Sequence, residues 1–212
     1  MNSHFAKPLS RSVAAFVLVL GLSGCATTVN NPKDPFEGFN RAMFTVNEGI
    51  DTVVKPVAQG YDKVTPEPVK AGVGNFFGNI ADLWIAVNNF LQGKPLDGFS
   101  DIGRVLVNST VGVIGLFDVA SGMGLEKHSE DFGQTLGAWG VASGPYLYWP
   151  VIGPRNVRDT FGFVVDASAD PVGHIDDVRA RNVLTGVRFI DLRASLLPAD
   201  KVVEQAAFDK YN

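Results

Sequence analysis

The only cysteine of the chain, Cys25, is the residue best placed for covalent chemistry. It ends the run Leu22-Ser23-Gly24-Cys25, which follows a basic start (Lys7, Arg11) and an apolar segment at 13–20. This order, apolar-small-small-cysteine after a basic and apolar leader, is typical of a bacterial lipoprotein signal. The thiolate would take a diacylglyceryl group through a thioether, and the small residues before it let a peptidase reach the backbone. We therefore expect lipidation at Cys25.

Two alternatives are an ordinary secreted protein with an incidental cysteine and a single-span anchor. The apolar segment is far shorter than the roughly 18 residues that a spanning helix needs, which counts against the anchor. With one cysteine, a disulfide within the molecule is impossible. The expected organisation is a cleaved signal peptide at 1–24, a lipidated polar tether at 25–33 and a folded domain at 34–212.

Other candidate reactive residues do not form catalytic patterns. His128 lies in the charged stretch 126–131, but no second histidine or cysteine is near, so a solvated turn is favoured over a metal site. His174 is expected in a loop. Ser143 lacks the glycine two residues earlier that a nucleophile elbow requires. The glycine-rich stretch 72–78 follows no strand, so close helix packing explains it better than phosphate binding. The sequence predicts no catalytic residue, metal or cofactor.

Composition narrows the function classes. Removal of 1–24 leaves 188 residues, which suits one domain or at most two small ones. The mature part has 16 basic and 22 acidic residues, a net charge of −6, because the leader takes two basic residues with it. This balance argues against nucleic acid and against a polybasic grip on anionic lipid. Charged residues make up 19% of the chain and mean hydropathy is +0.12, so more of the surface than usual must be uncharged.

Apolar residues recur at helical spacing along most of the chain. A first helix is expected from Phe36 to Val57, kinked or ended by Pro56, and a second short one from Thr65 as N-cap. Further helices are expected at 71–93, from Pro95 onward, at 157–165, at about 175–197 and after Pro198. Strict alternation is rare, so the predicted fold is mainly α.

The segment 71–93 carries one charge and reads as an amphipathic helix with an amide-rich polar face. Phe76, Trp84 and Phe90 belong to its apolar side, and Asn75, Asn79 and Gln92 to its polar side. Such stripes are usually core, and the alternative is contact with lipid.

The segment 132–154 has no charge, five glycines and three prolines, so a spanning helix is disfavoured. Its aromatic residues are types that settle at a membrane interface. We expect a short helix followed by a loop in or near lipid. The rim residues predicted from both segments are Phe76, Trp84, Phe90, Trp139, Tyr148 and Trp149.

Eight collinear motifs cover nearly the whole mature chain and resemble the VacJ/MlaA family of outer-membrane phospholipid-transport lipoproteins. The first follows the signal directly and reads Asp34-Pro35-Phe36-Glu37-Gly38-Phe39-Asn40-Arg41. The others are Asn75-Phe76-Phe77-Gly78-Asn79, Asn88 with Leu91-Gln92-Gly93, Arg104 with Val107-Asn108-Ser109-Thr110, Gly115 to Asp118, Asp131-Phe132-Gly133-Gln134-Thr135-Leu136, Gly144-Pro145-Tyr146, and Gly153-Pro154 with Arg158-Asp159.

The resemblance implies a single helical, ring-like domain embedded in the periplasmic leaflet of the outer membrane, with amphipathic helices around a central channel. It implies removal of phospholipids mislocalised to the outer leaflet, association with a trimeric porin, and delivery to a soluble periplasmic phospholipid carrier, without catalysis. Two alternatives remain: a structural porin-associated lipoprotein that conducts no lipid, and a lipid hydrolase.

The candidate channel or functional-motif residues come from four of these motifs. We also expect the Asn-rich face after Asn75 to line a wet passage for headgroups, with apolar helix faces against acyl chains. The candidate residues are Asp34, Pro35, Gly38, Phe39, Asn40, Arg41, Asn75, Phe76, Asn79, Gln92, Gly144, Pro145 and Tyr146.

The lipidation prediction is tested by mass spectrometry of the mature N-terminus. We expect the first residue to be Cys25 carrying diacylglyceryl and an amide-linked acyl chain, since several acyl chains together anchor a protein stably. An unmodified Cys25 at the mature N-terminus would contradict the prediction.

Overall fold

The computed structural model describes residues 34–206 and 211, with side chains for 34–203 and 211. The predicted signal peptide, the predicted lipidation site Cys25 and the predicted tether lie outside the described residues. The described chain forms two compact units. Unit 1 comprises 34–50, 145–156 and Tyr211, and unit 2 comprises 51–144 and 157–206.

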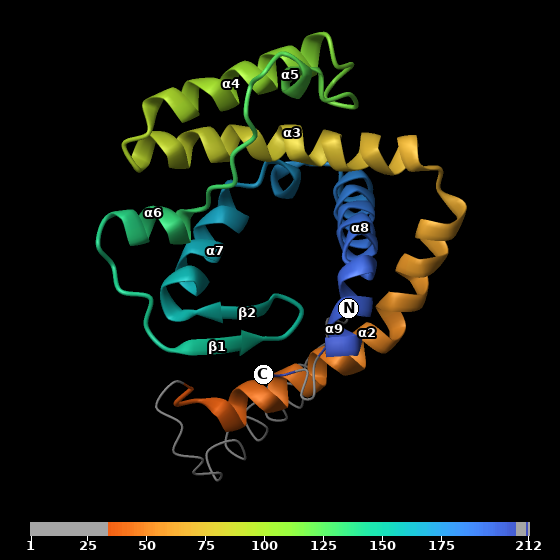
Figure 1. Ribbon diagram of the computed structural model, residues 1–212, viewed down its shortest axis with the longest axis vertical. Coiled ribbons are helices and arrows are strands. Elements are labelled where there is room, and N and C mark those ends of the chain that lie inside the picture. Colours follow the sequence, from red (N-terminus) through yellow and green to blue (C-terminus); the bar gives the residue numbers. More distant parts are fainter. Residues whose placement is uncertain (1–33, 207–210, 212) are drawn as a thin grey trace, which may run out of the picture. The chain divides into compact units, whose positions relative to one another are not determined.

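The elements are mostly helices, which confirms the predicted fold class. No helix within 34–206 is both long and apolar enough to cross a membrane. In chain order (Figure 1) they are α2 (Glu37–Val64), α3 (Glu67–Leu91), α4 (Pro95–Thr110), α5 (Val119–Gly122), α6 (Phe132–Ala138), β1 (Tyr146–Trp149), β2 (Gly153–Asn156), α7 (Val157–Ala169), the 3₁₀ helix η2 (Pro171–His174), α8 (Val178–Ser195) and α9 (Leu197–Ala206).

Helix α2 is longer than the sequence predicts, because it continues through Pro56 to Val64. A proline inside a helix removes one backbone hydrogen bond and costs about 3 kcal/mol. Ion pairs within five residues of Pro56 tie this part of α2 to α8 and α9. Asp51 accepts two hydrogen bonds from Arg193 of α8, at 2.7 and 2.9 Å, and Lys55 lies 3.2 Å from Asp200 of α9.

The second correction concerns α3. The sequence predicts a short helix capped by Thr65 and a separate amphipathic helix at 71–93. The structure has one helix of 25 residues whose N-cap position is Pro66, without a side-chain cap. The glycines near its start do not break it, and Gly72 and Gly74 lie in van der Waals range of Leu116 and Asp191 respectively.

The third correction is a β-hairpin in the segment that the sequence predicts to be a loop. Tyr146 pairs with Asn156 and Trp149 with Gly153 in an antiparallel ladder. The pairing leaves a three-residue turn at 150–152. Val151 in this turn has φ of +67°, which is unfavourable for a β-branched residue.

Two asparagines of α2, seven residues apart and hence two turns along one face, hold this hairpin within unit 1. Asn40 donates to the carbonyl of Tyr146 at 3.1 Å and accepts from the amide of Tyr148 at 2.8 Å. A neighbouring strand would satisfy the same two groups. Asn47 repeats the pattern with the carbonyl of Trp149 and the amide of Val151, at 2.9 and 2.6 Å. The second contact stabilises the strained turn.

Asn40 is fully buried and also donates to Asp34 at 2.8 Å. Asp34 in turn accepts a short hydrogen bond from the hydroxyl of Tyr211. Arg41 lies over the ring of Tyr211, 4.4 Å from its centroid. Polar contacts therefore join the start of α2, the hairpin and Tyr211 in unit 1.

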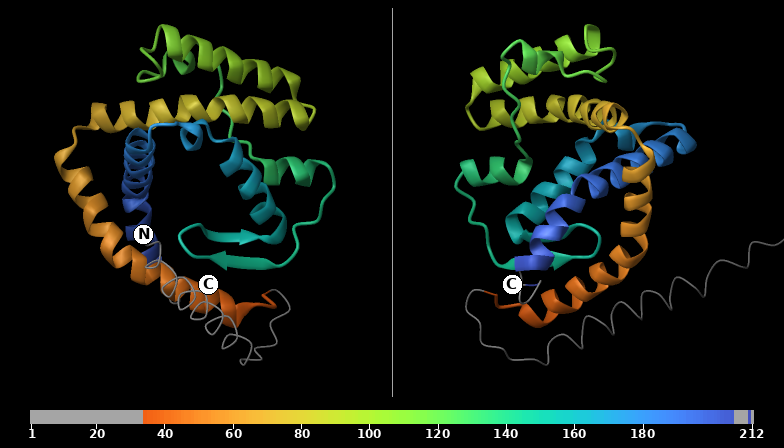
Figure 2. Two further views of the ribbon diagram at one scale, coloured as in Figure 1. Left: turned by 180° about the vertical axis from the view of Figure 1, so that it is seen from behind. Right: turned by 45° about the vertical axis from the view of Figure 1, so that its right-hand side comes forward.

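In unit 2, α3 and α4 lie side by side as an antiparallel helical pair, joined by a tight turn (Figures 1 and 2). Small residues allow the close approach. Ala86 is 2% exposed, and a Cβ at Gly98 would lie 2.8 Å from the ring of Phe90. Helices α6 and α7 form a second packed pair, in which Gly162 and Gly133 meet at a distance that leaves no room for a Cβ at Gly162.

Replacing Asn40 with Ala should loosen the hairpin. The change removes three hydrogen bonds, each worth about 0.5–1.5 kcal/mol, and leaves two β1 backbone groups without their partner. We expect the amide of Tyr148 to exchange with deuterium at least tenfold faster, measured by hydrogen-exchange mass spectrometry. Asn182→Ala on α8, at an exposed site, should leave this exchange unchanged. Equal exchange in the two variants would contradict the role of Asn40.

Candidate functional site

The interface between α3 and α4 is polar, and Arg104 of α4 lies at its centre. Its side chain is 2% exposed, and all three guanidinium nitrogens donate. Nε reaches Asp82 of α3 at 3.3 Å, and Nη2 reaches both oxygens of Asp118 at 3.0 Å. Nη1 donates to the Ser121 hydroxyl at 3.0 Å and to the carbonyl of Leu125 at 2.7 Å. One cation therefore fastens α4 to α3, to the start of α5 and to the segment after it.

The carboxylates around Arg104 have further partners. Asp82 is 1% exposed and forms a short ion pair with Lys127. Asp118 accepts from Ser121 and Asn108. Burial opposes ionisation of Asp118, but the hydrogen bonds from Ser121, Asn108 and Arg104 outweigh it and hold the pKa of Asp118 well below its usual value. The buried charges of Arg104 and Asp82 are thus paired, as a low-dielectric setting requires.

Amides and a histidine extend this interface in both directions. Asn79 donates to the Ser109 hydroxyl at 2.9 Å, and Asn89 donates to the fully buried Asp101 at 2.8 Å. His128 Nδ1 lies 2.9 Å from the same Asp101. Burial of the His128 ring disfavours its charged form, but the Asp101 carboxylate outweighs this effect and raises the pKa of His128. We call the buried set Asn79, Asp82, Asn89, Asp101, Arg104 and Asn108 the polar seam.

A second layer of polar contacts joins α3 to α6 and α7. The Thr135 hydroxyl of α6 donates to buried Asn88 at 2.7 Å. Trp84 Nε1 donates to Asp166 of α7 at 2.7 Å, and the same carboxylate oxygen accepts from the amide of Phe132 at 2.9 Å. The polar side of α3 therefore faces protein along much of its length.

The apolar side of the same pair is exposed. On α4, Leu96, Phe99 and Leu106 are 82%, 65% and 62% exposed. On α3 the side chains of Leu83, Val87, Phe90 and Leu91 are exposed as well. By contrast, the buried apolar side chains of the described residues are small, none larger than valine; they are Ala58, Ala86, Ala120, Val172 and Ala194. Burial in this pair is inverted relative to a water-soluble protein.

The turn after α4 continues the apolar surface. Val113 and Ile114 have φ of +53° and +58°, and their side chains are exposed. Backbone hydrogen bonds hold this strained turn, for example from Ile114 to Ser109 at 3.1 Å. Asn75 of α3 donates to the carbonyl of Leu116 at 3.2 Å. We call the exposed apolar side chains of α3, α4 and this turn the apolar exterior.

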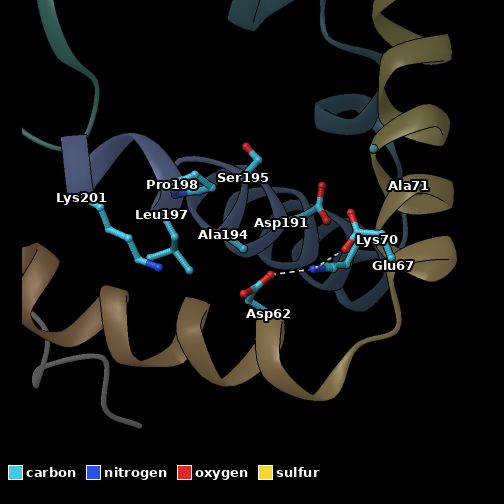
Figure 3. A pocket seen from close by; sticks show the side chains of 11 residues that line it. Asp62, Glu67, Lys70, Ala71, Asp191, Ala194, Ser195, Leu197, Pro198 and Lys201 are labelled. Atoms are coloured by element: carbon cyan, nitrogen blue, oxygen red, sulfur yellow. Dashed lines mark hydrogen bonds and ion pairs between the residues drawn. The ribbon is translucent and has the colours of Figure 1, made fainter. Parts of the chain in front are cut away.

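Unit 2 also contains an open cavity of about 510 Å³ between α2, α3, α8 and α9 (Figure 3). Small and apolar residues of α3, α8 and α9 form part of its lining. Its charged lining residues are Asp62 of α2, Glu67 and Lys70 of α3, Asp191 of α8 and Lys201 of α9. We call it the charged cavity.

Three contacts fix the walls of the charged cavity. Lys70 pairs with Asp62 at 2.6 Å and with Glu67 at 2.8 Å, and both carboxylates raise the pKa of Lys70. The Tyr61 hydroxyl donates to Asp191 Oδ1 at 2.7 Å. Burial and this hydrogen bond raise the pKa of Tyr61 to about 12, so the hydroxyl stays protonated as a donor.

The structure separates the predicted site residues into groups. Asp34, Asn40, Arg41 and Tyr146 come together in unit 1, where Tyr211 joins them. Pro35 is exposed, and Gly38 and Phe39 are half-buried, with Phe39 in edge contact with Trp149. Gly144 has φ of +70° and packs near Val157, and Pro145 is exposed. The role of these residues in lipid passage stays a prediction.

On α3, Asn79 belongs to the polar seam. Gln92 donates to Glu130 and to Thr135 at 2.9 and 3.2 Å, and Asn75 holds the turn after α4. These amides thus hold neighbouring elements together. That this face also lines a wet passage stays a prediction.

The predicted rim residues differ in exposure. Phe90 is 38% and Trp139 is 55% exposed. The others, Phe76, Trp84, Tyr148 and Trp149, are half-buried. Trp139 Nε1 nevertheless donates to the carbonyl of Leu91 at 2.9 Å, so its polar atom is satisfied while its ring is exposed.

The sequence analysis does not predict that the polar seam holds α3 and α4 together. The sequence puts Asp82 and Asn89 on the polar face of the amphipathic helix expected at 71–93, and the structure buries both. The sequence analysis names Arg104 only as part of a family motif. The available signal was that α4 places Asp101, Arg104 and Asn108 three and four residues apart, on the side opposite its leucines.

A polar interior, an apolar exterior and an open charged cavity define a helical protein built for a lipid environment. The family comparison agrees: residues 32–212 match the MlaA lipoprotein model, and the chain belongs to the MlaA lipoprotein family.

Relatives support this membership. The chain is 33% identical to the "intermembrane phospholipid transport system lipoprotein MlaA" of Escherichia coli, over 94% of this chain and 81% of that protein. It is 42% identical over 62% of its length to an uncharacterised protein of Rickettsia typhi, of which the match covers 53%. A solved structure described as the "structural basis for maintenance of bacterial outer membrane lipid asymmetry" matches with a TM-score of 0.72 and 33% identity, over 84% of this chain and 91% of that one.

Replacing Arg104 with Met should destabilise unit 2. The change removes the buried cation that Asp82 shares with Asp118. Because Asp82 keeps Lys127 and Asp118 is partly exposed, we expect a loss below the roughly 3–5 kcal/mol that breaking a fully buried pair costs. Urea unfolding in detergent micelles measures the effect. Arg179→Met, which removes an exposed arginine at the start of α8, is the control and should change stability little. If both variants unfolded at the same urea concentration, the seam would not hold the pair together.

Proposed function

We propose that this protein is the outer-membrane lipoprotein of an intermembrane phospholipid transport system. It removes phospholipids mislocalised to the outer leaflet and passes them toward the periplasm, which maintains the lipid asymmetry of that membrane. The observation that carries the proposal is the inverted burial of the α3–α4 pair, a polar seam inside and an apolar exterior. Family membership supports the transport of phospholipids between membranes, since relatives are named for this transport.

The apolar exterior supports a position among acyl chains. In water, each exposed leucine or phenylalanine forgoes about 1.5–3 kcal/mol of burial energy, and the exterior carries many of them. Acyl chains of one leaflet would cover this surface without a spanning helix. We propose that the domain sits in the periplasmic leaflet, anchored there by lipidated Cys25.

The polar groups support passage of a headgroup. Moving a phosphate through hydrocarbon alone costs several kcal/mol or more, so a conduit must offer a polar path beside an apolar one. The charged cavity offers such a path within unit 2, and the apolar exterior of the same unit suits the tails. The protein then lowers a barrier and catalyses no reaction. The family resemblance implies a ring with a central channel, and we propose that the lipid passes through this channel.

We further propose two partners, a trimeric porin in the outer membrane and a soluble periplasmic phospholipid carrier. Their support is the family resemblance. A lipid leaving the conduit needs an acceptor that shields its tails from water, which is the task of such a carrier. The porin would hold the protein beside the outer leaflet.

A transfer assay tests the function. The full-length lipidated protein is placed in vesicles with fluorescent phospholipid, and transfer to a soluble lipid-binding acceptor is measured. We expect transfer with the wild-type chain and at least a tenfold loss with Leu106→Asp, because a carboxylate cannot remain among acyl chains. Gln59→Asp, at an exposed site of α2, is the control for added charge and should transfer normally.

Two outcomes would contradict the proposal. A wild-type chain that bound porin but transferred no phospholipid would be a structural lipoprotein. Release of free fatty acid during the assay would reveal a hydrolase.

A further inference from the structure

The charged cavity has an arrangement of charge that neither the family name nor the fold explains. Three carboxylates and two ammonium groups line it. Lys70 is engaged by both Asp62 and Glu67. This three-residue group carries one net negative charge and has no cation left over.

The remaining charged residues, Asp191 and Lys201, come from the consecutive helices α8 and α9 (Figure 3). Asp191 accepts from Tyr61 through Oδ1. Its Oδ2 lies near Gly74 of α3, 3.8 Å from where a Cβ would lie, and no described residue donates a hydrogen bond to it. Among the described residues Lys201 has no carboxylate within ion-pair distance, and its side chain extends into the space beside Leu197 and Asp62 (Figure 3).

The neighbouring ionic cluster does not alter this balance. Arg193 and Lys55 are matched by Asp51 and Asp200, which gives no net charge behind the cavity wall. Among the described residues, the cavity thus presents one cation without a carboxylate partner and one carboxylate oxygen with spare acceptor capacity, within a lining whose net charge is negative by one.

We propose that the charged cavity selects zwitterionic phospholipid headgroups that carry both a phosphate and a primary ammonium. This inference rests on the proposed transport function. The phosphate binds Lys201, and the ammonium donates to Oδ2 of Asp191. A primary ammonium suits this carboxylate because it has three N–H donors.

Two other headgroup classes fit less well. A glycerol headgroup has a phosphate but no cation, so it leaves Asp191 unmatched and adds negative charge to a negative cavity. A quaternary ammonium has the right charge but no N–H, so it cannot donate to Asp191. The expected order is therefore phosphoethanolamine first, phosphocholine second and phosphoglycerol third.

The volume agrees with this assignment. At about 510 Å³ the cavity is within the range of sites that hold small molecules, and its opening leaves a way for the rest of the lipid.

The test measures which lipids the full-length lipidated protein retains. The protein is equilibrated with vesicles of equal amounts of dioleoyl phosphatidylethanolamine, phosphatidylcholine and phosphatidylglycerol, repurified, and its lipids are quantified by mass spectrometry. We expect phosphatidylethanolamine to exceed phosphatidylglycerol roughly two- to fivefold, the size expected for one partly exposed charge pair.

Two variants locate the selection. Asp191→Asn keeps an acceptor for Tyr61 but removes the charge, so the ratio should fall to about one while the total bound lipid is retained. Lys201→Gln should lower the bound amount of all three lipids. Asp176→Asn and Lys63→Gln, both exposed and outside the cavity, are matched controls and should behave as wild type. Circular dichroism confirms that each variant is folded.

The outcomes separate this inference from the function on which it rests. Equal retention of the three lipids by the wild-type chain would overturn the selection while the transport function stands. A preference that survives Asp191→Asn would also overturn it. If the wild-type chain retained no phospholipid of any kind, the proposed function itself would fail.

Discussion

The structure depends on one constraint, that charged and amide groups removed from water must find partners inside the protein. Arg104 meets this constraint for buried Asp82 and partly exposed Asp118, and Asn108 meets it with both ends of its amide. Asn79 and Asn89 meet it with their N–H groups, whereas their buried amide oxygens have no partner among the described residues. Because these groups lie between α3 and α4, the two helices turn their polar sides toward each other. The leucines, valines and phenylalanines of the apolar exterior therefore lie on the outside of this helix pair.

This inversion of burial requires α3 and α4 to lie close together. Small residues, such as Ala86 and Gly98, let the helices approach closely enough for short side chains to hydrogen-bond across the seam. The same logic operates in unit 1, where Asn40 and Asn47 satisfy the backbone of a hairpin that has a single partner strand. In each case polar contacts fix the geometry.

Much of the fold is predictable from sequence, because helical periodicity is visible whichever side is buried. The spacing of Leu96, Phe99, Ile102 and Leu106 predicts α4 correctly. Periodicity cannot say whether a stripe faces core or lipid, and the family resemblance was needed to favour lipid. The seam was missed for this reason, since Asp82 and Asn89 look like solvated residues until Arg104 and Asp101 are found opposite them.

Other features could not be predicted because they depend on distant partners. The β-hairpin has short strands and no alternation, and it is held by Asn40 and Asn47, about a hundred residues away in the chain. Pro56 stays within α2 because ion pairs of neighbouring residues reach α8 and α9. The charged cavity gathers residues from four helices, and no local pattern links Asp62 with Asp191 or Lys201.

The most direct test of the account is the environment of the outer face of α4. A spin label at Leu106→Cys in the lipidated protein, reconstituted in bilayers, reports its accessibility to oxygen and to a water-soluble nickel complex. We predict that the label collides more often with oxygen than with nickel, whereas a label at Gln59→Cys on α2 shows the reverse. If the nickel complex reached Leu106 as readily as Gln59, the apolar exterior would face water and the account would be wrong.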